Sequence, residues 1–387
     1  MPRNRQNKSI MFILGSLEPG CDGVGDYTRT LAIECVRRGV DCYLVSICDR
    51  ESSCNFKEEE CHGFKIYRSS ILNEGDGYLS LQRLIDKILP DWISLQFVPY
   101  SYHFKGIVKQ LVSFFGKLSL KSDIHFMFHE TWIEFNGDSS WRHYVWGRIQ
   151  KYYIKKLLKV LKPKLINTSN EFYRNLLVQE NIAVDVLPIF SNIRLFDDFN
   201  KDDFYNLLSE NGLKIDTGNR DEYWVVGLFG SIHKEWDSAP FIDSLAFSAR
   251  MNGKKLLLVS FGNQGSGEYI WENLKKSEGD SYQCISLGSL SEEKVSLVLS
   301  CIDYSISTSM YELSYKSGVV MAYLNHGVPV LFSRFSLADS LELERHPNHD
   351  LLIKVTSKSL SSLDSVKRKE AVSWLPFVCD KFMKSIS

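Results

Sequence analysis

Residues 305–330 have the sequence SISTSMYELSYKSGVVMAYLNHGVPV, and they carry the clearest sign of the fold. A strand expected at 304–307 leads into a polar loop, and an apolar helix is expected at 318–325, ended by Gly327. A second strand is expected at 329–332. Parallel strands need a crossover connection, which is usually a helix. The segment therefore predicts one β–α–β unit with a polar loop at the carboxyl end of its first strand.

The same alternation of apolar runs and helix-length amphipathic segments extends over most of the chain. The expected strands of a first series lie at 9–17, 41–47, 66–68, 92–98, 125–129 and 165–168. A second series begins at 224–229 and continues to 351–355. Continuous apolar strands alternating with amphipathic helices are typical of parallel sheets covered on both faces. We therefore predict an α/β fold with two Rossmann-like parallel-sheet domains that face a cleft.

The chain between the two series is polar and irregular, which indicates an interdomain connection. The expected divisions are a first domain at 1–195, a connection at 196–221, a second domain at 222–362 and a C-terminal segment at 363–387. This last segment has a helical pattern that Pro376 interrupts. In open parallel sheets, ligands bind beyond the carboxyl ends of the strands, so the residues after each strand are the candidates for a site.

Composition and charge exclude several classes of protein. Of the 387 residues, 44% are hydrophobic, which is too many for a disordered chain. The 46 Lys and Arg residues nearly balance the 47 Asp and Glu residues, whereas a protein specialised for nucleic acid usually has a basic excess. No apolar run reaches the roughly 18 residues of a membrane span, and residues 10–14 are too few for the core of a signal peptide. We expect a cytoplasmic protein with reduced cysteines and no metal site.

A glycine-rich loop follows the first expected strand. Gly20, Gly23 and Gly25 precede an expected helix, and a helix N-terminus offers N–H groups to an anion. The loop is compatible with a flexible turn, with a ligand-binding loop, or with a dinucleotide fingerprint that lacks its third glycine. In the last interpretation Asp49, at the end of the second strand, would bind a ribose.

Polar residues suited to proton transfer or phosphate binding follow several other strands. His129 and Glu130 end one strand, where they could act on protons or hold a sugar hydroxyl. The candidates in the second series are Gly230, Ser231, His233, Lys234, Gly262, Lys316, Ser317 and Gly318. The last three stand at a helix start, where free amides, a hydroxyl and an ammonium group favour an anion. Each group is also compatible with an ordinary loop or helix start.

Together these segments resemble the GT-B glycosyltransferases, specifically the large retaining family that uses nucleotide-sugar donors and is known as family 4. The resemblance covers most of the chain. It rests on the glycine loop, on the Phe229-Gly230 pair that opens the second domain, and on the sequence HGVPV at 326–330. It implies that a nucleotide-sugar donor binds the second domain and that a glycan, lipid-linked or other hydroxyl acceptor binds the first. It also implies a C-terminal helix that returns to the first domain, and transfer without a metal or cofactor.

The resemblance assigns roles to the candidate residues. The catalytic residues would be His129, Glu130 and Glu312. The donor-binding residues would be Gly23, Gly25, Gly230, His233, Lys234, Gly262, Lys316, Ser317 and Gly318. Without a metal, the charge of the leaving diphosphate would fall on basic side chains and helix-start amides.

Departures from the family pattern keep other functions open. The Glu-x7-Glu pair of the family falls on Ser314 and Ala322, so Glu312 is the substitute for the first acid and the second acid has none. Ile232 stands where an Arg is expected. The alternatives are a non-catalytic sugar-nucleotide-binding protein, a GT-B-fold epimerase or phosphorylase, and an enzyme of hydride transfer.

A basic helix is expected at about 141–161. Between Arg142 and Lys164 the charged residues are all Lys or Arg, and apolar and tyrosine residues stand between them. A basic amphipathic helix can lie on an anionic membrane, which would suit a lipid-linked acceptor. The same pattern is compatible with a solvated helix face, whereas nucleic-acid binding is disfavoured by the neutral charge of the whole chain.

Overall fold

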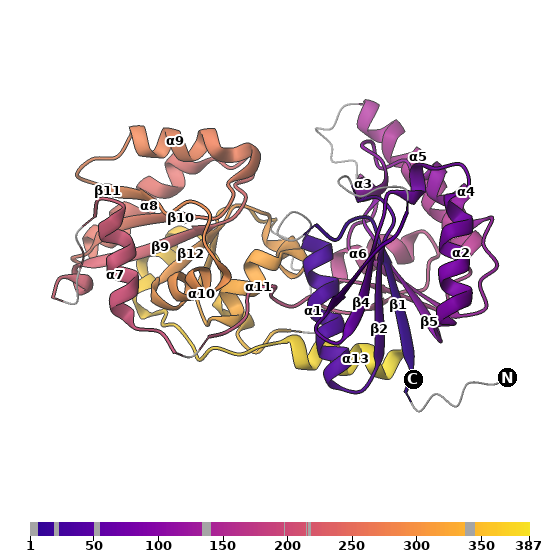
Figure 1. Cartoon of the computed structure of the whole chain (residues 1–387). Helices are drawn as coiled ribbons and strands as arrows, with labels where there is room; N and C mark the ends of the chain where they lie inside the picture. Colours follow the sequence, from indigo (N-terminus) through magenta and orange to yellow (C-terminus); the bar gives the residue numbers. More distant parts are fainter. Residues whose placement is uncertain are drawn as a thin grey trace. The chain divides into compact units, whose positions relative to one another are not determined.

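The computed structural model describes residues 7–18, 23–49, 55–133, 141–196, 198–213, 215, 218–336 and 345–387. Packing divides the chain into two compact units, each with its own sheet (Figure 1). The first unit comprises Met1–Pro188 together with Leu375–Ser387, and the second comprises Ile189–Trp374. The second unit is therefore inserted between two parts of the first.

The first unit is built on an eight-stranded sheet with the order β3-β4-β2-β1-β5-β6-β7-β8. Its strands are β1 (Ser9–Leu14), β2 (Asp41–Ser46), β3 (Lys57–Cys61), β4 (Phe64–Arg68), β5 (Trp92–Phe97), β6 (Asp123–Phe128), β7 (Leu165–Thr168) and β8 (Asp185–Val186). Every pairing is parallel except β3 with β4. All residues of β1 and β5 are buried, because helices cover both faces of a parallel sheet.

The helices of the first unit are α1 (Gly23–Arg37), α2 (Gly77–Ile88), α3 (Pro99–Tyr102), α4 (Lys109–Phe115), α5 (Trp141–Leu161), α6 (Glu171–Gln179) and α13 (Leu375–Ser385), with a 3-10 turn η1 at Ile71–Asn73. Met11 and Ile13 of β1 belong to one continuous apolar core with α2, α4 and α5. Phe12 points the other way, toward α13, because successive side chains of a strand alternate between the two faces.

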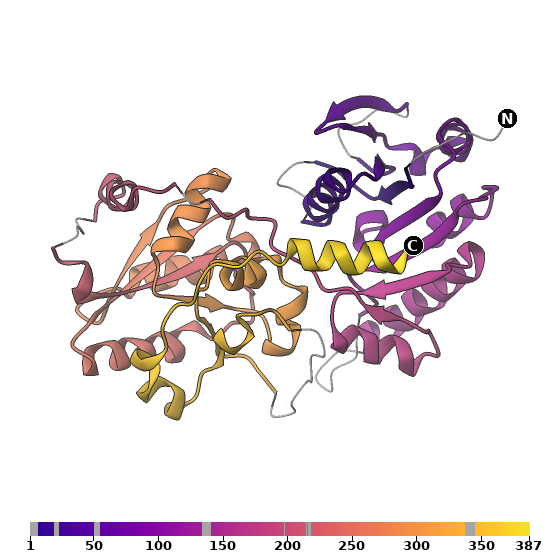
Figure 2. The same cartoon turned by 90° about the horizontal axis from the view of Figure 1, so that it is seen from below.

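The C-terminal helix α13 completes the first unit. It lies beside α1 in both views (Figures 1 and 2), and Cys379 Sγ is 3.7 Å from Cys35 Sγ. Phe382 is fully buried, with its ring 5.9 Å from the ring of Phe12 and 5.3 Å from that of His125. The last helix of the chain thus covers strands from its beginning.

The second unit contains a six-stranded sheet with the order β11-β10-β9-β12-β13-β14, and its strand pairs are parallel. The strands are β9 (Tyr223–Phe229), β10 (Lys255–Phe261), β11 (Tyr282–Ser286), β12 (Tyr304–Ser307), β13 (Val330–Phe332) and β14 (Leu352–Lys354). The helices are α7 (Lys201–Glu210), α8 (Ser238–Met251), α9 (Glu268–Lys276), α10 (Glu292–Cys301), α11 (Gly318–Asn325) and α12 (Ser357–Ser361). The 3-10 turns are η2 (Arg220–Glu222), η3 (Gly265–Gly267), η4 (Tyr311–Lys316), η5 (His349–Leu351) and η6 (Leu363–Ser365).

Two parallel-dominated sheets in an α/β chain confirm the predicted Rossmann-like architecture, with local differences, of which α6 and β8, absent from the expected elements, are two. Strand β3 was not expected, because its sequence KEEEC has no apolar run. It pairs antiparallel at the sheet edge, where charged side chains discourage further pairing. Pro376 stands at the second position of α13 and does not interrupt it, since the first turn of a helix does not need the missing N–H.

Candidate functional site

The strand orders place one topological switch point in each sheet. In the first sheet the chain leaves β1 toward β2 and later returns to β5 on the other side of β1. In the second sheet it leaves β9 toward β10 and returns to β12 on the other side of β9. Ligands of doubly wound sheets bind beyond the carboxyl ends of the strands at such points. The loops after β1, β5, β9 and β12 are therefore the first places to look for a site.

A pocket of about 160 Å³ lies at the switch point of the second sheet. It is lined by residues 228–232 from the end of β9, by residues 306–309 from the end of β12, and by Ser317 and Val319 at the start of α11. Gly230 adopts a positive φ of 72°, and a Cβ atom there would lie 3.3 Å from Val319. A glycine at this position therefore keeps the loop close to the helix start. Among the described residues, no acidic side chain lines the pocket.

The start of α11 gives one wall of this pocket a favourable potential for an anion. Ser317 is the N-cap residue, and its Oγ accepts a hydrogen bond of 3.3 Å from the backbone N–H of Val320. The N–H groups of a first helical turn carry partial positive charge. Of the predicted Lys316-Ser317-Gly318 motif, Ser317 lines the pocket, whereas Lys316 and Gly318 are its neighbours in sequence and do not line it.

The loop after β9 is tied to the loop after β12. The backbone N–H of His233 donates a hydrogen bond of 2.9 Å to Thr308 Oγ1, and Thr308 lines the pocket. Burial and the nearby Arg334 guanidinium lower the pKa of His233. The carbonyl of Lys234 accepts a hydrogen bond from the hydroxyl of Tyr269, and the Lys234 side chain is exposed. His233 and Lys234 thus flank the pocket without lining it.

Arg334 is a basic residue near this pocket that sequence reasoning missed. It follows β13, and its guanidinium donates hydrogen bonds of 3.2 Å to the carbonyl of Thr308 and to Glu235 Oε2. The one sequence signal for a role of Arg334 in the site is its position just after a strand. Many loop residues have the same signal. Gly262, at the end of β10, has a φ of 83°, and a Cβ there would come within 3.2 Å of the Phe229 ring. Gly262 therefore shapes the neighbouring loop and does not line the pocket.

Glu312 is a buried carboxylate with half of its hydrogen-bonding capacity unused. It lies in η4, between β12 and α11, with an exposed fraction of 9%. Its Oε1 accepts hydrogen bonds of 2.7 and 2.9 Å from the N–H and hydroxyl of Ser336. Its Oε2 has no partner among the described residues. Because buried acceptors are normally satisfied, Oε2 is suited to accept a hydrogen bond from a ligand.

In the first unit, His129 ends a buried polar network across the middle of the sheet. Its Nε2 lies 2.8 Å from Gln96 Oε1, and Gln96 Nε2 donates to Ser94 Oγ at 2.7 Å. Ser94 Oγ lies 2.8 Å from His125 Nδ1, and His125 Nε2 lies 3.1 Å from Asn167 Oδ1. Burial lowers the pKa of His129 to about 3 and that of His125 to about 4. Both imidazoles are therefore neutral near pH 7, so His129 acts as a hydrogen-bonding group and not as a cation.

The glycine loop reaches the start of α1. Gly23 and Gly25 stand in the first turn of that helix, after the carboxyl end of β1, while Gly20 lies outside the described residues. A Cβ atom at Gly23 would meet no atom within 4 Å. Packing therefore does not require a glycine at position 23. Glu130 follows β6 beside His129, at the same edge of the sheet.

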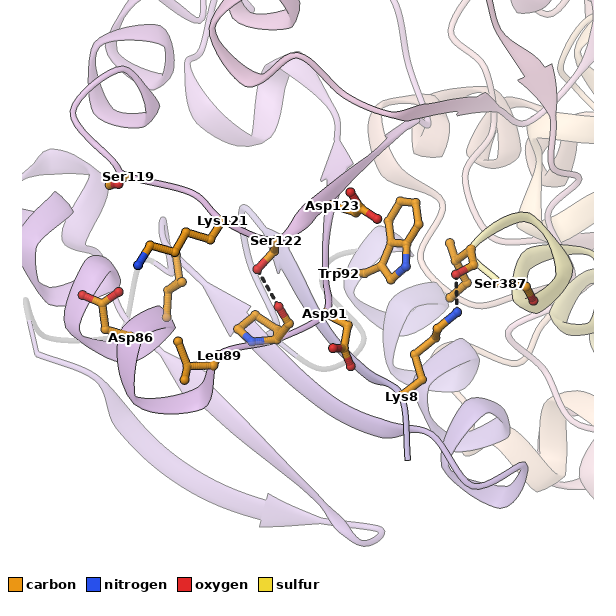
Figure 3. A pocket seen from close by; sticks show the side chains of 13 residues that line it. Lys8, Asp86, Leu89, Asp91, Trp92, Ser119, Lys121, Ser122, Asp123 and Ser387 are labelled. Carbon is orange, nitrogen blue, oxygen red and sulfur yellow. Dashed lines mark hydrogen bonds between the residues drawn. The ribbon is translucent and has the colours of Figure 1, made fainter. Parts of the chain in front are cut away.

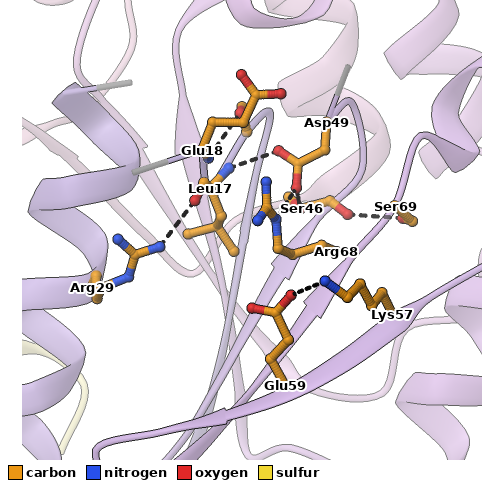
Figure 4. A network of polar contacts seen from close by, with 10 residues as sticks. Leu17, Glu18, Arg29, Ser46, Asp49, Lys57, Glu59, Arg68 and Ser69 are labelled. Carbon is orange, nitrogen blue, oxygen red and sulfur yellow. Dashed lines mark hydrogen bonds and ion pairs between the residues drawn. The ribbon is translucent and has the colours of Figure 1, made fainter. Parts of the chain in front are cut away.

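Asp49 holds the end of β1 in place (Figure 4). It is fully buried and accepts hydrogen bonds from Leu17 N–H at 2.8 Å, Ser46 Oγ at 2.6 Å and Arg68 Nε at 2.8 Å. Burial alone would raise the pKa of Asp49, but the hydrogen bonds from Arg68, Ser46 and Leu17 outweigh it and hold the pKa below its ordinary value. Since both carboxylate oxygens serve these contacts, Asp49 is not available to a ribose. Asp49 therefore does not serve as the ribose-binding acid that the dinucleotide interpretation of the glycine loop requires.

A larger pocket, of about 460 Å³, lies at the opposite edge of the first sheet (Figure 3). Its lining includes Lys8, Asp91 and Asp123 at the amino ends of β1, β5 and β6. Asp91 accepts hydrogen bonds from the N–H and hydroxyl of Ser9, and Asp123 forms an ion pair of 2.7 Å with Lys164. These carboxylates already have protein partners, and the pocket lies away from the strand ends where ligands of such sheets bind. It is a weaker candidate than the pocket between β9 and β12.

Comparison with known proteins identifies the fold. No protein-family model matches the chain, and no curated protein sequence matches it significantly. Among solved structures, HepE from Anabaena in complex with UDP and glucose is similar over 98% of this chain and 99% of that chain, with a TM-score of 0.51 and 12% identity. The catalytic domain of starch synthase IV from Arabidopsis thaliana, bound to ADP and acarbose, is similar over 98% of this chain and 99% of that chain, with a TM-score of 0.52 and 13% identity.

An epimerase has the same fold. The structure described as a UDP-N-acetylglucosamine 2-epimerase from Listeria monocytogenes is similar over 98% of this chain and 96% of that chain, with a TM-score of 0.51 and 11% identity. Identities of this size establish the arrangement of the chain and leave its reaction open. The chain therefore has the GT-B fold, with two Rossmann-like units, which glycosyltransferases share with a sugar-nucleotide epimerase.

Proposed function

We propose that this protein is a glycosyltransferase that moves a sugar from a nucleotide-sugar donor to a hydroxyl acceptor. The observation that carries the proposal is the pocket between β9 and β12, with the start of α11 as one wall. Its described lining residues are uncharged, and Arg334 lies beside it. Its volume of about 160 Å³ is below the roughly 300 Å³ of a complete small-molecule site, so it would hold the diphosphate and not the whole donor.

The chemistry needs a stabilised leaving group. In the transfer, the bond between the anomeric carbon and the diphosphate oxygen breaks, and its electron pair leaves with the diphosphate. The acceptor oxygen bonds to the same carbon and releases its proton. We assign the leaving charge to the α11 start, with Arg334, Lys316 and Lys234 as the nearby cations. Transfer without a metal and with retention of configuration belongs to this proposal.

Two further residues would contact the sugar. The unused Oε2 of Glu312 would accept a hydrogen bond from a sugar hydroxyl, which would satisfy a buried acceptor. His129, as a neutral imidazole, would contact the transferred sugar from the first unit, with Glu130 next to it. Gly23 and Gly25 would allow close approach of the ligand to the start of α1. A glycan or lipid-linked acceptor and a cytoplasmic location complete the proposal.

The first test is a thermal-shift panel of UDP, GDP, ADP and NAD. A ligand present at 100 times its dissociation constant stabilises the folded state by about 2.7 kcal/mol, which corresponds to a rise of roughly 5–10 °C in Tm for a unit of this size. We expect one nucleoside diphosphate to give this rise and NAD to give none. Arg334→Ala and Lys316→Ala should each reduce the rise, while the matched control Arg250→Ala, on α8, should preserve it. A panel in which no nucleoside diphosphate raises Tm would contradict the proposal.

Two alternatives are separated by the products. The similarity to the Listeria structure keeps a sugar-nucleotide epimerase open, although the described residues that line the pocket include no carboxylate. With UDP-N-acetylglucosamine, an epimerase gives a product with the opposite configuration at C2, in which the sugar is still bonded to the diphosphate. NMR spectroscopy detects this change of configuration. A glycosyltransferase releases the nucleoside diphosphate. A protein that binds the diphosphate and forms neither product would be a non-catalytic binding protein.

A further inference from the structure

Two segments of the first unit contain basic residues and no acidic ones. Residues 98–122 and 141–170 together contain twelve Lys and Arg and no Asp or Glu, so the other 34 basic and 47 acidic residues give the rest of the chain a net charge of −13. The two segments contain α4 and α5, which pack against each other (Figure 1). A nearly neutral chain therefore has one strongly basic region, although its total charge conceals it.

The outward face of α5 is a stripe of cations and tyrosines. Its exposed residues are Tyr144, Val145, Arg148, Tyr152, Lys156 and Lys159, which we call the α5 stripe. Their spacing of three and four residues places them on one side of the helix, opposite the buried Ile154, Leu157 and Leu161. A solvated helix face usually mixes both signs of charge, whereas this one contains no acid.

One carboxylate partly neutralises the flank of α5, and the stripe remains charged. Lys151 and Lys155 both pair with Glu180, at 2.5 and 2.6 Å, and these bonds lower the pKa of Glu180. On the stripe, Arg148 donates a hydrogen bond of 2.7 Å to the hydroxyl of Tyr144. Among the residues with described positions, Arg148, Lys156 and Lys159 have no acidic partner. These three cations are available to an external anion.

Large aromatic side chains are exposed beside these cations. Tyr152 is 60% exposed in the middle of the stripe, and Phe104 is 78% exposed in the loop between α3 and α4. This loop is anchored to α5, because the buried Gln150 donates hydrogen bonds to the carbonyl of Lys105 at 2.8 Å and to the hydroxyl of Tyr100 at 3.2 Å. The Lys105 ammonium also lies 4.4 Å from the centre of the Trp146 ring. Phe104 is therefore held next to the first turns of α5.

We propose that the α5 stripe and Phe104 form a docking surface for an anionic lipid bilayer. Its cations would lie against the phosphate head groups. Tyr152 and Phe104 would enter the boundary between head groups and acyl chains, a region that favours aromatic side chains. A helix packed on a sheet presents a convex face, while proteins that bind single-stranded nucleic acid use a basic groove. No helix in the described part of the chain is long and apolar enough to cross a membrane, so the contact is peripheral.

The position of this surface connects it with the acceptor. The loop that contains Phe104 follows the carboxyl end of β5, at the switch point of the first sheet, and α5 begins at the same edge, after β6. A membrane at this surface would present a lipid-linked hydroxyl close to the edge where His129 lies. This assignment of the acceptor rests on the proposed function, whereas the docking itself does not depend on it.

The test is flotation of the full-length protein with vesicles. We expect binding to phosphatidylcholine vesicles that contain phosphatidylglycerol, a decrease in binding with added salt, and little binding to pure phosphatidylcholine. The double variant Lys156→Glu/Lys159→Glu should bind at least about 30-fold more weakly, because each lysine near an anionic surface contributes about fivefold, and charge reversal adds repulsion. Lys276→Glu/Lys358→Glu, with two exposed lysines of the second unit, changes the net charge equally and should bind like the wild type.

A second pair of variants, Phe104→Ser and Tyr152→Ser, tests the aromatic residues without changing the charge. Each variant should bind the vesicles about tenfold or more weakly. The proposal is wrong if phosphatidylglycerol has no effect, if the control double variant loses as much binding as the stripe variant, or if single-stranded RNA binds more tightly with the same dependence on Lys156 and Lys159. The thermal shift by a nucleoside diphosphate should persist in the stripe variant. Vesicle binding without any nucleotide-induced shift would reject the proposed function and keep the docking surface.

Discussion

Replacement of Asp49 by alanine is expected to destabilise the first unit by about 3–5 kcal/mol. The carboxylate accepts three hydrogen bonds, from Leu17, Ser46 and Arg68. Its removal leaves the buried N–H of Leu17 unsatisfied, which costs about 1–3 kcal/mol. It also leaves the Arg68 guanidinium, with a side chain only 17% exposed, without its partner. Removing one partner of a mostly buried ion pair leaves an uncompensated charge. The stability lost in this way exceeds the net contribution of the intact pair.

The loss can be measured by urea denaturation followed by circular dichroism, and it should lower Tm by roughly 6–20 °C. Asp86→Ala is the matched control, because Asp86 is exposed on α2 and its one described hydrogen bond comes from the side chain of Gln82. Its effect should stay within about 0.5 kcal/mol. Since the folded pKa of Asp49 is lowered, its contribution is present at neutral pH and disappears as the pH falls through that folded pKa.

A double-mutant cycle isolates the ion pair. Adding Arg68→Ala to Asp49→Ala removes the uncompensated cation, so the double variant should be more stable than the sum of the two single losses by about 1–3 kcal/mol. A cost below about 1 kcal/mol for Asp49→Ala would refute the reasoning, because a typical surface residue costs no more. Additive losses in the cycle would show that Asp49 acts through Leu17 and Ser46 alone.

Two other predictions concern the buried histidines and the C-terminal helix. Burial lowers the pKa values of His125, His129, His326 and His346 to about 4, 3, 4 and 4. The unfolded chain binds more protons between pH 6.5 and 4, so the free energy of unfolding should fall on acidification by up to about 1.4 kcal/mol per pH unit for each histidine. Equal urea midpoints at pH 7 and pH 5 would contradict this. Phe382→Ala should lower the free energy of unfolding by about 3–5 kcal/mol, since its ring is fully buried against β1. Phe377→Ala, at a 43% exposed position of the same helix, should lower it by less than about 0.5 kcal/mol. Thermal denaturation of the two variants tests this difference.

The sequence was sufficient for most elements of the parallel sheets. Strand β12 and helix α11 have the predicted bounds, because a short strand before a polar loop and an apolar helix between Ser317 and Gly327 are local signals. Strand β3 could not be predicted, since its residues are charged and only its pairing with β4 makes it a strand. Pro376 was misinterpreted, because an interruption and a helix start have the same residue signal.

The site was predictable only where it follows directly from a strand end. Gly230 and Ser317 line the pocket between β9 and β12, as residues after a strand or at a helix start can. Thr308 and Arg334 became recognisable only from the strand order, which brings the loops after β9, β12 and β13 together. The internal use of Asp49 was likewise not readable, because its partners Leu17 and Arg68 are distant in sequence.

The inserted position of the second unit affects how the protein can be made. During synthesis, β1 leaves the ribosome long before the helix that covers Phe12, because α13 is translated after the whole second unit. The first unit therefore acquires its full hydrophobic layer only after the second has been translated. A fragment that ends at Pro188 would expose the surface around Phe12 and Cys35, and attaching Leu375–Ser387 through a short linker should restore its solubility.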